Sequence, residues 1–185
     1  GETFYLSERP GTIAKITENQ LEHQTVVFSD ELISEGEAGL LGFLLDSNFS
    51  TNQEAFAYYT YSEDGEIFNK IVKLKLEDKE WREVTVLVDQ LPSGHYHAGG
   101  RLAIGPDHKL YATVGDAYEL SKVQETDSLN GKILRLNLDG TIPADNPFNN
   151  SYVYSYGHRN SQGLAWTTEG TLYASEHGEN AHDEI

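Results

Sequence analysis

The chain has 185 residues, which is long enough for one domain with a sizeable hydrophobic core. Its 30 Asp and Glu residues outnumber 13 Lys and Arg residues, and the formal net charge of -17 argues against nucleic acids and anionic membrane surfaces as partners. The absence of Cys excludes disulfides, zinc-thiolate sites and thiol nucleophiles. No apolar run approaches the length of a transmembrane helix, so we predict one domain over residues 1–185 without a membrane span.

The sequence indicates an almost entirely β structure. Apolar and polar residues alternate in short segments separated by Gly, Pro, Asp and Asn, which is typical of strands. In chain order, these segments are residues 4–8, 56–61, 70–78, 83–89, 109–116 and 132–140. Helical periodicity is scarce. Only residues 117–130 are compatible with a short helix, although the pair Asn130-Gly131 favours a turn there.

Two pairs of segments repeat at one common interval. "IVKLKL" (71–76) and "ILRLNL" (133–138) start 62 residues apart, and so do "RLAIGPDHKLYAT" (101–113) and "GLAWTTEGTLYAS" (163–175). Weaker copies of the same inner strand occur at 4–8 and 56–61. Repeats built from four short strands predict the blades of a β-propeller, and the four inner strands predict about three blades.

The predicted blade count is smaller than a closed ring requires, because propellers close with roughly four to eight blades. We therefore expect the ring to be completed by residues outside this chain or by a second fragment. The alternative fold is an ordinary β-sandwich in which the similarity between strands is accidental.

The first candidate site is "GHYHAGGRLAIGPDHKLYATVGD" (94–116). His97 precedes one predicted strand and Asp116 ends the next, so an antiparallel return would bring both side chains to the same end of a blade. A carboxylate beside an imidazole fixes its tautomer and stabilises the imidazolium, as a general base requires. The alternative is a loop His and a turn Asp that do not touch.

The second candidate is "YGHRNSQGLAW" (156–166), in which Arg159 and Asn160 follow a Gly where a blade loop would turn toward the axis. Arg159 is one of few cations, and it would either bind an anionic cofactor and stabilise developing negative charge or pair with a neighbouring carboxylate.

The third candidate is "SEHGENAHDEI" (175–185). Its two His residues lack the spacing of a helical zinc site, whereas carboxylates separated by Gly and Asn suit an oxygen-liganded cation such as calcium. A solvated acidic loop is the alternative.

The chain resembles the glucose/sorbosone dehydrogenase family, the soluble quinoprotein aldose sugar dehydrogenases. The resemblance rests on "YLSERPGTI" (5–13), "GEAGLLGF" (36–43), "HAGGRLAIGPDHKLYATVGD" (97–116), "SLNGKILRLNLDGTIPADNPF" (128–148) and the second and third candidate segments, in family order. It implies a six-bladed propeller that uses pyrroloquinoline quinone (PQQ) and calcium to oxidise the anomeric carbon of an aldose to the lactone. It also implies an external electron acceptor and an extracellular or periplasmic location, although the chain begins without an export signal.

The resemblance also implies roles for individual residues. His97 matches the general base, Asp116 the carboxylate that orients it, and Arg159 the side chain that stabilises the quinone oxygen as it gains charge. The other positions carried over are Glu37 and Asn160 for contact with the cofactor, the main-chain carbonyls of Gly178 and Glu179 for the calcium beside the quinone, and the Glu184 side chain for a further calcium.

Two departures from the family pattern affect these expectations. Tyr96 stands before the base where glucose-oxidising relatives have Asp, so glucose is not assured as the preferred sugar. The later Lys and Arg residues that hold the carboxylates of the quinone have no counterpart here, so we expect residues 1–185 alone not to oxidise sugars.

Two other functions stay open on the sequence. The first is a propeller that binds ligands or proteins without catalysis, and it would not need the pair His97 and Asp116. The second is a metal-dependent lactonase, which would use Glu37, Asp116 and Asn160 as axial ligands.

Overall fold

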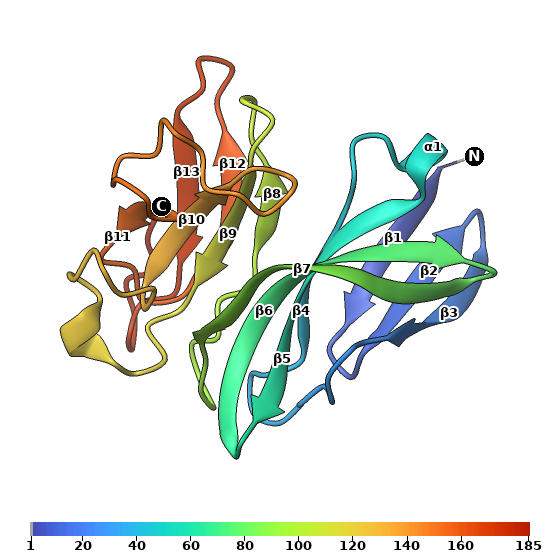
Figure 1. The fold of residues 1–185 in the computed structure, drawn as a ribbon, viewed down its shortest axis with the longest axis horizontal. Helices are drawn as coiled ribbons and strands as arrows, with labels where there is room; N and C mark the ends of the chain where they lie inside the picture. The colour runs from blue at the N-terminus through green and yellow to red at the C-terminus, as the bar shows by residue number, and fades with distance from the viewer. Residues whose placement is uncertain (1) are drawn as a thin grey trace.

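The computed structural model describes residues 2–185, and its strands form three sheets (Figure 1). The seven-stranded sheet has the order β1 (Thr3–Glu8), β2 (Thr12–Thr17), β3 (Gln20–Val27), β7 (Glu80–Pro92), β6 (Glu66–Glu77), β5 (Glu54–Glu63) and β4 (Leu40–Leu45). The four-stranded sheet has the order β11 (Val153–Tyr156), β10 (Lys132–Leu136), β9 (Leu110–Val114) and β8 (Leu102–Ile104). The last sheet pairs β12 (Ser161–Trp166) with β13 (Leu172–Glu176).

Two of these units are antiparallel four-stranded meanders, β4 to β7 and β8 to β11, which are complete propeller blades. Strands β1 to β3 and the hairpin β12–β13 are parts of two more blades. The seven-stranded sheet is two units joined at their outer strands, because β3 meets β7 through only two parallel pairs, Val26 with Trp81 and Val27 with Arg82. This agrees with the prediction of about three blades.

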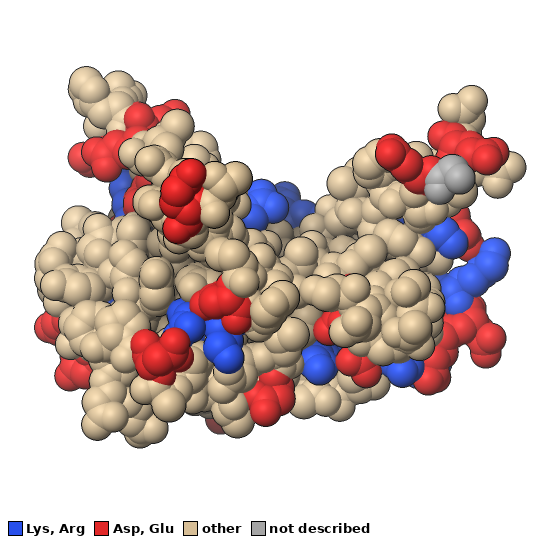
Figure 2. Space-filling model, turned by 90° about the horizontal axis from the view of Figure 1, so that it is seen from above, with Lys and Arg blue, Asp and Glu red and all other residues tan. Residues whose placement is uncertain are grey.

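The first strands of successive units, β4, β8 and β12, lie beside one another and form the inner wall. Figure 2 shows the molecule from above as a crescent, with Lys or Arg atoms at the centre of its concave side. No helix among residues 2–185 is long and apolar enough to cross a membrane.

The interval of 62 residues is the spacing between equivalent strands of neighbouring blades. Leu110 and Leu172 each begin the second strand of their unit, β9 and β13. The other repeat joins the third strands, since Ile71 lies in β6 and Ile133 in β10. The structure corrects the prediction of four inner strands: the segments that start at residues 71 and 133 belong to the third strands β6 and β10, and residues 56–61 lie in the second strand β5. Residues 4–8 lie in β1, which is beside the inner strand β4.

One strand end and two helical segments differ from the sequence expectations. The strand predicted at 132–140 ends at Leu136, because a turn closed by Gly140 N donating to Asn137 O (2.9 Å) follows it. The stretch 117–130 contains only the 3-10 turn η1 (Leu120–Lys122). The short helix α1 (Phe49–Asn52) was not predicted, and it is too short to show helical periodicity.

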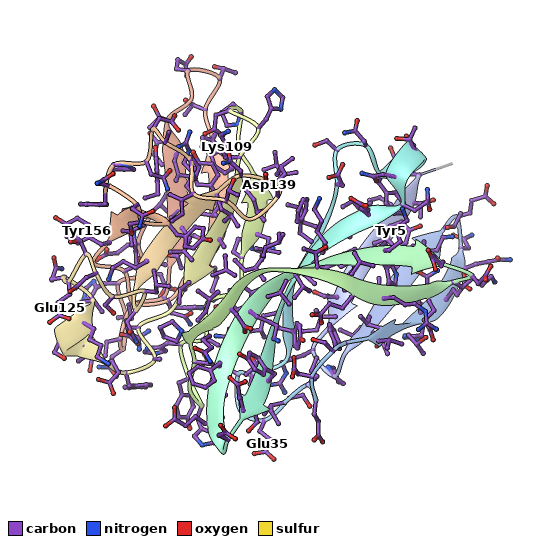
Figure 3. The ribbon with its side chains drawn as sticks, in the orientation of Figure 1. Tyr5, Glu35, Lys109, Glu125, Asp139 and Tyr156 are labelled. Atoms are coloured by element: carbon purple, nitrogen blue, oxygen red, sulfur yellow. The ribbon has the colours of Figure 1, made fainter. Side chains whose placement is uncertain are left out.

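The hydrophobic core lies between the blades in two clusters. Alternate residues of β5 enter each one: Phe56 and Tyr58 face the blade β8 to β11, whereas Ala57 and Tyr59 face β1 to β3. Trp81 is fully buried at the centre of the second cluster and donates to Gln24 Oε1 (2.9 Å). Tyr5, labelled in Figure 3, packs against its indole with ring centroids 5.9 Å apart. Such close packing on both sheet faces fixes how each blade is oriented against the next.

Candidate active site

The candidate residues gather at one end of the blades. They precede β4, β8 and β12 or follow β9 and β13, and an antiparallel hairpin brings the start of its first strand beside the end of its second. In Figure 3 the labelled residues Glu35 and Glu125 belong to loops of this end, in the lower part of the view. Lys109 and Asp139 mark the opposite end, in the upper part.

His97 and Asp116 meet, which decides between the two alternatives that their spacing left open. His97 Nδ1 lies 2.7 Å from Asp116 Oδ1, and both residues are buried. Gly115 makes this approach possible, because a Cβ on it would lie 1.6 Å from the carbonyl oxygen of His97. The backbone of His97 is left-handed (φ 55°), a conformation that costs roughly 1–3 kcal/mol for a residue other than Gly and is concentrated at functional sites.

The surrounding residues fix the Asp116 carboxylate from several sides. Its Oδ1 also accepts the amide of Tyr118 (2.8 Å), and Asn130 Nδ2 donates to its main-chain oxygen (3.0 Å). Its Oδ2 is buried and has no hydrogen-bond partner among residues 2–185. The Asp116 carboxylate beside Nδ1 orients the imidazole, and its charge would stabilise an imidazolium formed during a reaction.

The loop that carries His97 is held from two neighbouring elements. Glu37, before β4, accepts the His97 amide on Oε2 (2.7 Å). From the blade β4 to β7, the Tyr58 hydroxyl (3.0 Å) and Asn69 Nδ2 (3.3 Å) donate to the carbonyl of Ala98. Burial raises the pKa of Tyr58, which keeps that hydroxyl protonated as a donor.

Asn160 and Arg159 lie across from this loop, in the turn before β12. Asn160 Oδ1 accepts the amide of Gly99 (3.2 Å) and Gln162 Nε2 (2.9 Å), which ties the turn to the His97 loop. Arg159 is half-buried and donates from Nη1 to the carbonyl of His177 (3.2 Å). This contact uses Nη1, and the other guanidinium donors are left for an anionic ligand or a carboxylate.

Glu176, at the end of β13, anchors that turn and was not identified from the sequence. Its Oε1 accepts the amides of Arg159 and Asn160 (2.9 Å for the latter), and its Oε2 lies 3.1 Å from His158 Nδ1 and 3.3 Å from Ser161 Oγ. Burial acts to raise the pKa of Glu176, but the hydrogen bonds from His158 and the two amides outweigh it and hold that pKa below its ordinary value.

A pocket of about 300 Å³ lies between these elements. Its walls are Arg9, Gly36, Glu37, Leu41, Ala98, Gly99, Asn160, Gln162 and His177. Arg9 donates to the carbonyl of Gly36 at its rim. Arg9, the side-chain amides of Asn160 and Gln162 and the apolar Leu41 and Ala98 line this pocket, and Arg159 precedes Asn160 in the same turn. Guanidinium and amide groups donate to carboxylate and carbonyl oxygens, and the apolar side chains suit a flat ring, so these residues match a flat aromatic polyanion such as PQQ. The residues present therefore fit the quinone that the family resemblance implies.

The three residues expected at calcium lie around a second pocket of about 260 Å³, which Arg159 and His177 also line. Gly178 donates its amide to Asp183 Oδ1 (3.0 Å), and Glu184 exchanges backbone hydrogen bonds with Glu176 (3.0 Å each). The carbonyl oxygens of Gly178 and Glu179 accept no hydrogen bond from residues 2–185. Within the same range, no group of three His, Asp or Glu side chains converges to hold a metal. The calcium ligands stay a prediction.

Two contributors to the site could not be recognised in the sequence. The ring of Tyr118 stacks on His97 from an irregular turn. Glu176 binds the amide of Asn160, 16 positions earlier in the chain. The one sequence signal for Glu176 was its place in the repeat, since it ends β13 as Val114 ends β9.

Comparison with known proteins finds sugar dehydrogenases. A protein-family model described as Glucose / Sorbosone dehydrogenase matches residues 1–185. Quinoprotein glucose dehydrogenase B of Acinetobacter calcoaceticus is 39% identical over 215 residues, covering 98% of this chain and 45% of that protein. Aldose sugar dehydrogenase YliI of Escherichia coli is 32% identical over 164 residues, covering 81% of this chain and 43% of that protein.

Among solved structures, the PQQ-bound aldose sugar dehydrogenase of Streptomyces coelicolor matches with a TM-score of 0.89 and 35% identity, over 98% of this chain and 55% of that chain. This likeness confirms the predicted all-β fold of the six-bladed propeller dehydrogenases and rejects the β-sandwich. The chain spans about half the length of the relatives it matches. Because the family model matches residues 1–185, the chain belongs to the glucose/sorbosone dehydrogenase family.

Proposed function

We propose that the full-length protein containing these residues oxidises the anomeric carbon of an aldose to the lactone, with PQQ as cofactor. The observation that carries the proposal is the buried pair of His97 and Asp116 beside a pocket that Arg9 lines. Family membership supports it, because the matched proteins include a quinoprotein glucose dehydrogenase and a PQQ-bound aldose sugar dehydrogenase.

His97 is the general base in this proposal. Asp116 accepts a hydrogen bond from Nδ1–H, which leaves Nε2 as the basic nitrogen of the neutral ring. Nε2 takes the proton of the anomeric hydroxyl, and the Asp116 carboxylate stabilises the imidazolium that forms. Asp116 and Glu37 fix the ring and the backbone of His97 before the sugar binds, so the base needs no rearrangement in the reaction.

Arg9, Arg159 and Asn160 would hold the quinone through its carboxylates and carbonyl oxygens. When bound, the quinone supplies the acceptor for the hydride that leaves the anomeric carbon. For calcium we propose the carbonyls of Gly178 and Glu179, with the Glu184 side chain at a further calcium ion. An external acceptor would reoxidise the cofactor. An extracellular or periplasmic location is proposed from family membership alone, and cell fractionation tests it.

The test is reconstitution of the full-length protein with PQQ and calcium, followed by an aldose screen with an artificial electron acceptor. We expect dye reduction that depends on sugar and cofactor, and a loss of at least about 100-fold in kcat for His97→Ala, as general-base catalysis predicts. His108→Ala is the matched control, because His108 lies in the exposed turn between β8 and β9 at the other end of the blade. Undiminished turnover of His97→Ala would remove the base from the mechanism.

The two alternative functions fit the described residues less well. A binding module without catalysis gives no reason to bury a carboxylate against an imidazole. A lactonase would need Glu37, Asp116 and Asn160 to share a metal, but Glu37 Oε2 and Asp116 Oδ1 both contact His97, and among residues 2–185 no three His, Asp or Glu side chains converge to hold a metal. Metal-dependent lactone hydrolysis without PQQ would favour the lactonase.

A further inference from the structure

Three aromatic rings run outward from the candidate base. The ring of Tyr118 stacks on the imidazole of His97 with centroids 4.4 Å apart and an interplanar angle of 15°. The ring of Tyr96 then meets Tyr118 edge to face, with centroids 5.7 Å apart. His97 is 5% exposed, whereas Tyr96 is 54% and Tyr118 is 59% exposed. The two tyrosines therefore present aromatic surface to solvent directly beside the buried imidazole.

The backbone holds Tyr118 in this place against its own preference. Ala117 (φ 51°) and Tyr118 (φ 62°) are both left-handed, a conformation that bulky residues rarely adopt. The hydrogen bond from the Tyr118 amide to Asp116 Oδ1 fixes it there. A tyrosine that served the core would bury its ring, but this one is turned toward solvent over the base. The conformation is explained if the exposed ring surface binds something.

We propose that Tyr96 and Tyr118 form an aromatic platform that binds the second sugar unit of a reducing disaccharide or longer oligosaccharide. The proposal rests on the proposed sugar oxidation. One face of a pyranose ring is lined by C–H groups and packs against an aromatic face, while its hydroxyls can bond to a tyrosine hydroxyl at the edge. The platform has both features.

The geometry decides which unit of the sugar the platform can hold. One face of Tyr118 is occupied by the imidazole of His97, so a sugar on the other face is separated from the base by the thickness of the aromatic ring. Its anomeric hydroxyl could not reach His97 Nε2. The unit on the platform must therefore be remote from the reacting carbon, while the reducing unit would lie at His97 Nε2.

The platform would act on substrate selection and not on the chemical step. Contacts to a remote part of the substrate that are equal in the ground and transition states lower KM without raising kcat. A disaccharide would use these contacts and glucose would not. From the usual strength of aromatic contacts, we expect the ratio of disaccharide to glucose kcat/KM to fall by about 3- to 10-fold when one platform ring is removed.

The test uses the full-length protein loaded with PQQ and calcium, with cellobiose, maltose and glucose as substrates. Tyr96→Ala and Tyr118→Ala should lower the disaccharide to glucose ratio through KM, and Tyr118→Phe should keep most of it. Tyr96 does not touch His97, so its variant stays informative if Tyr118→Ala disturbs the base. Tyr156→Ala is the matched control, because Tyr156 is also exposed (44%) and packs edge to face on Phe148 at 5.8 Å, away from the base.

The outcomes separate this proposal from the proposed function. Equal losses for all three sugars would overturn the platform and make Tyr118 a positioning residue for His97. A ratio that neither alanine variant changes would also overturn it. If no aldose is oxidised, the proposed function fails first, and calorimetric titration with cellobiose then decides: binding that Tyr96→Ala weakens supports the platform, and no binding by the wild type overturns it.

Discussion

Replacing Glu176 should destabilise the turn that carries Arg159 and Asn160. Its carboxylate is the acceptor of both backbone amides, and Asn160 is buried, so Glu176→Ala leaves those donors without a partner. Each unsatisfied donor costs roughly 1–3 kcal/mol, so we expect a loss of about 2–6 kcal/mol in the free energy of unfolding. Glu176→Gln keeps one oxygen for the amides, but it removes the charge and replaces Oε2, the acceptor beside His158 and Ser161, with an NH2 group, which should cost about 1–3 kcal/mol.

The pH dependence gives a second readout for the same carboxylate. The pKa of Glu176 is lower in the folded protein than the ordinary value of 4.5, so the ionised form stabilises the fold. This contribution is fully present above the unfolded pKa and is lost as the pH falls through the folded pKa. The difference in unfolding free energy between the wild type and Glu176→Gln should therefore be constant near neutral pH and shrink below about pH 4.5.

Urea denaturation of the full-length protein and its variants, repeated from pH 7 to pH 3, measures both effects. Glu169→Ala is the control on the same hairpin, because Glu169 is exposed and accepts the neighbouring Thr168 hydroxyl (2.8 Å) in the tip of the hairpin. It should change stability by no more than about 0.5 kcal/mol. A loss for Glu176→Ala as small as that of the control would show that water replaces the carboxylate and would refute the reasoning.

Two further predictions concern the base and its support. Asp116→Asn keeps an oxygen beside His97 Nδ1 but removes the charge. In steady-state assays this should lower kcat about 10-fold with little change in KM. An unchanged kcat would show that the charge does not stabilise the imidazolium. Gly115→Ala should abolish soluble folded protein, because its Cβ would overlap the His97 carbonyl, whereas Gly170→Ala, with open space but φ 87°, should cost only about 1 kcal/mol in thermal or urea unfolding. A stable Gly115→Ala protein would mean that the loop can move away.

The pairing of His97 with Asp116 was one of two alternatives that the sequence left open, and local chain geometry is what made it possible. Each residue flanks a strand of one hairpin, and the alternation of apolar residues fixes where those strands begin and end. The repeat of 62 residues identified the blades for the same reason, since each copy is a short hairpin with its own turn signals.

The contacts between blades could not be read from the sequence. Glu37 reaches the His97 amide from a separate blade, 60 positions away, and β3 joins β7 through only two parallel pairs. No periodicity reports which loops of different blades meet. Tyr118 was missed because nothing in its neighbours predicts a left-handed backbone at a bulky residue.

The two-sided burial of β5 limits the kinds of sequence change this family member can accept. Phe56 and Tyr58 belong to one core cluster, and Ala57 and Tyr59 belong to the other. Each of these side chains therefore packs against one of the two neighbouring units. Substitutions of similar size affect one cluster at a time. Deleting a single residue would instead exchange the two faces along part of the strand, so that residues such as Phe56 and Ala57 would enter each other's cluster. Insertions and deletions should therefore be confined to the loops at the blade ends, one of which carries the candidate active site.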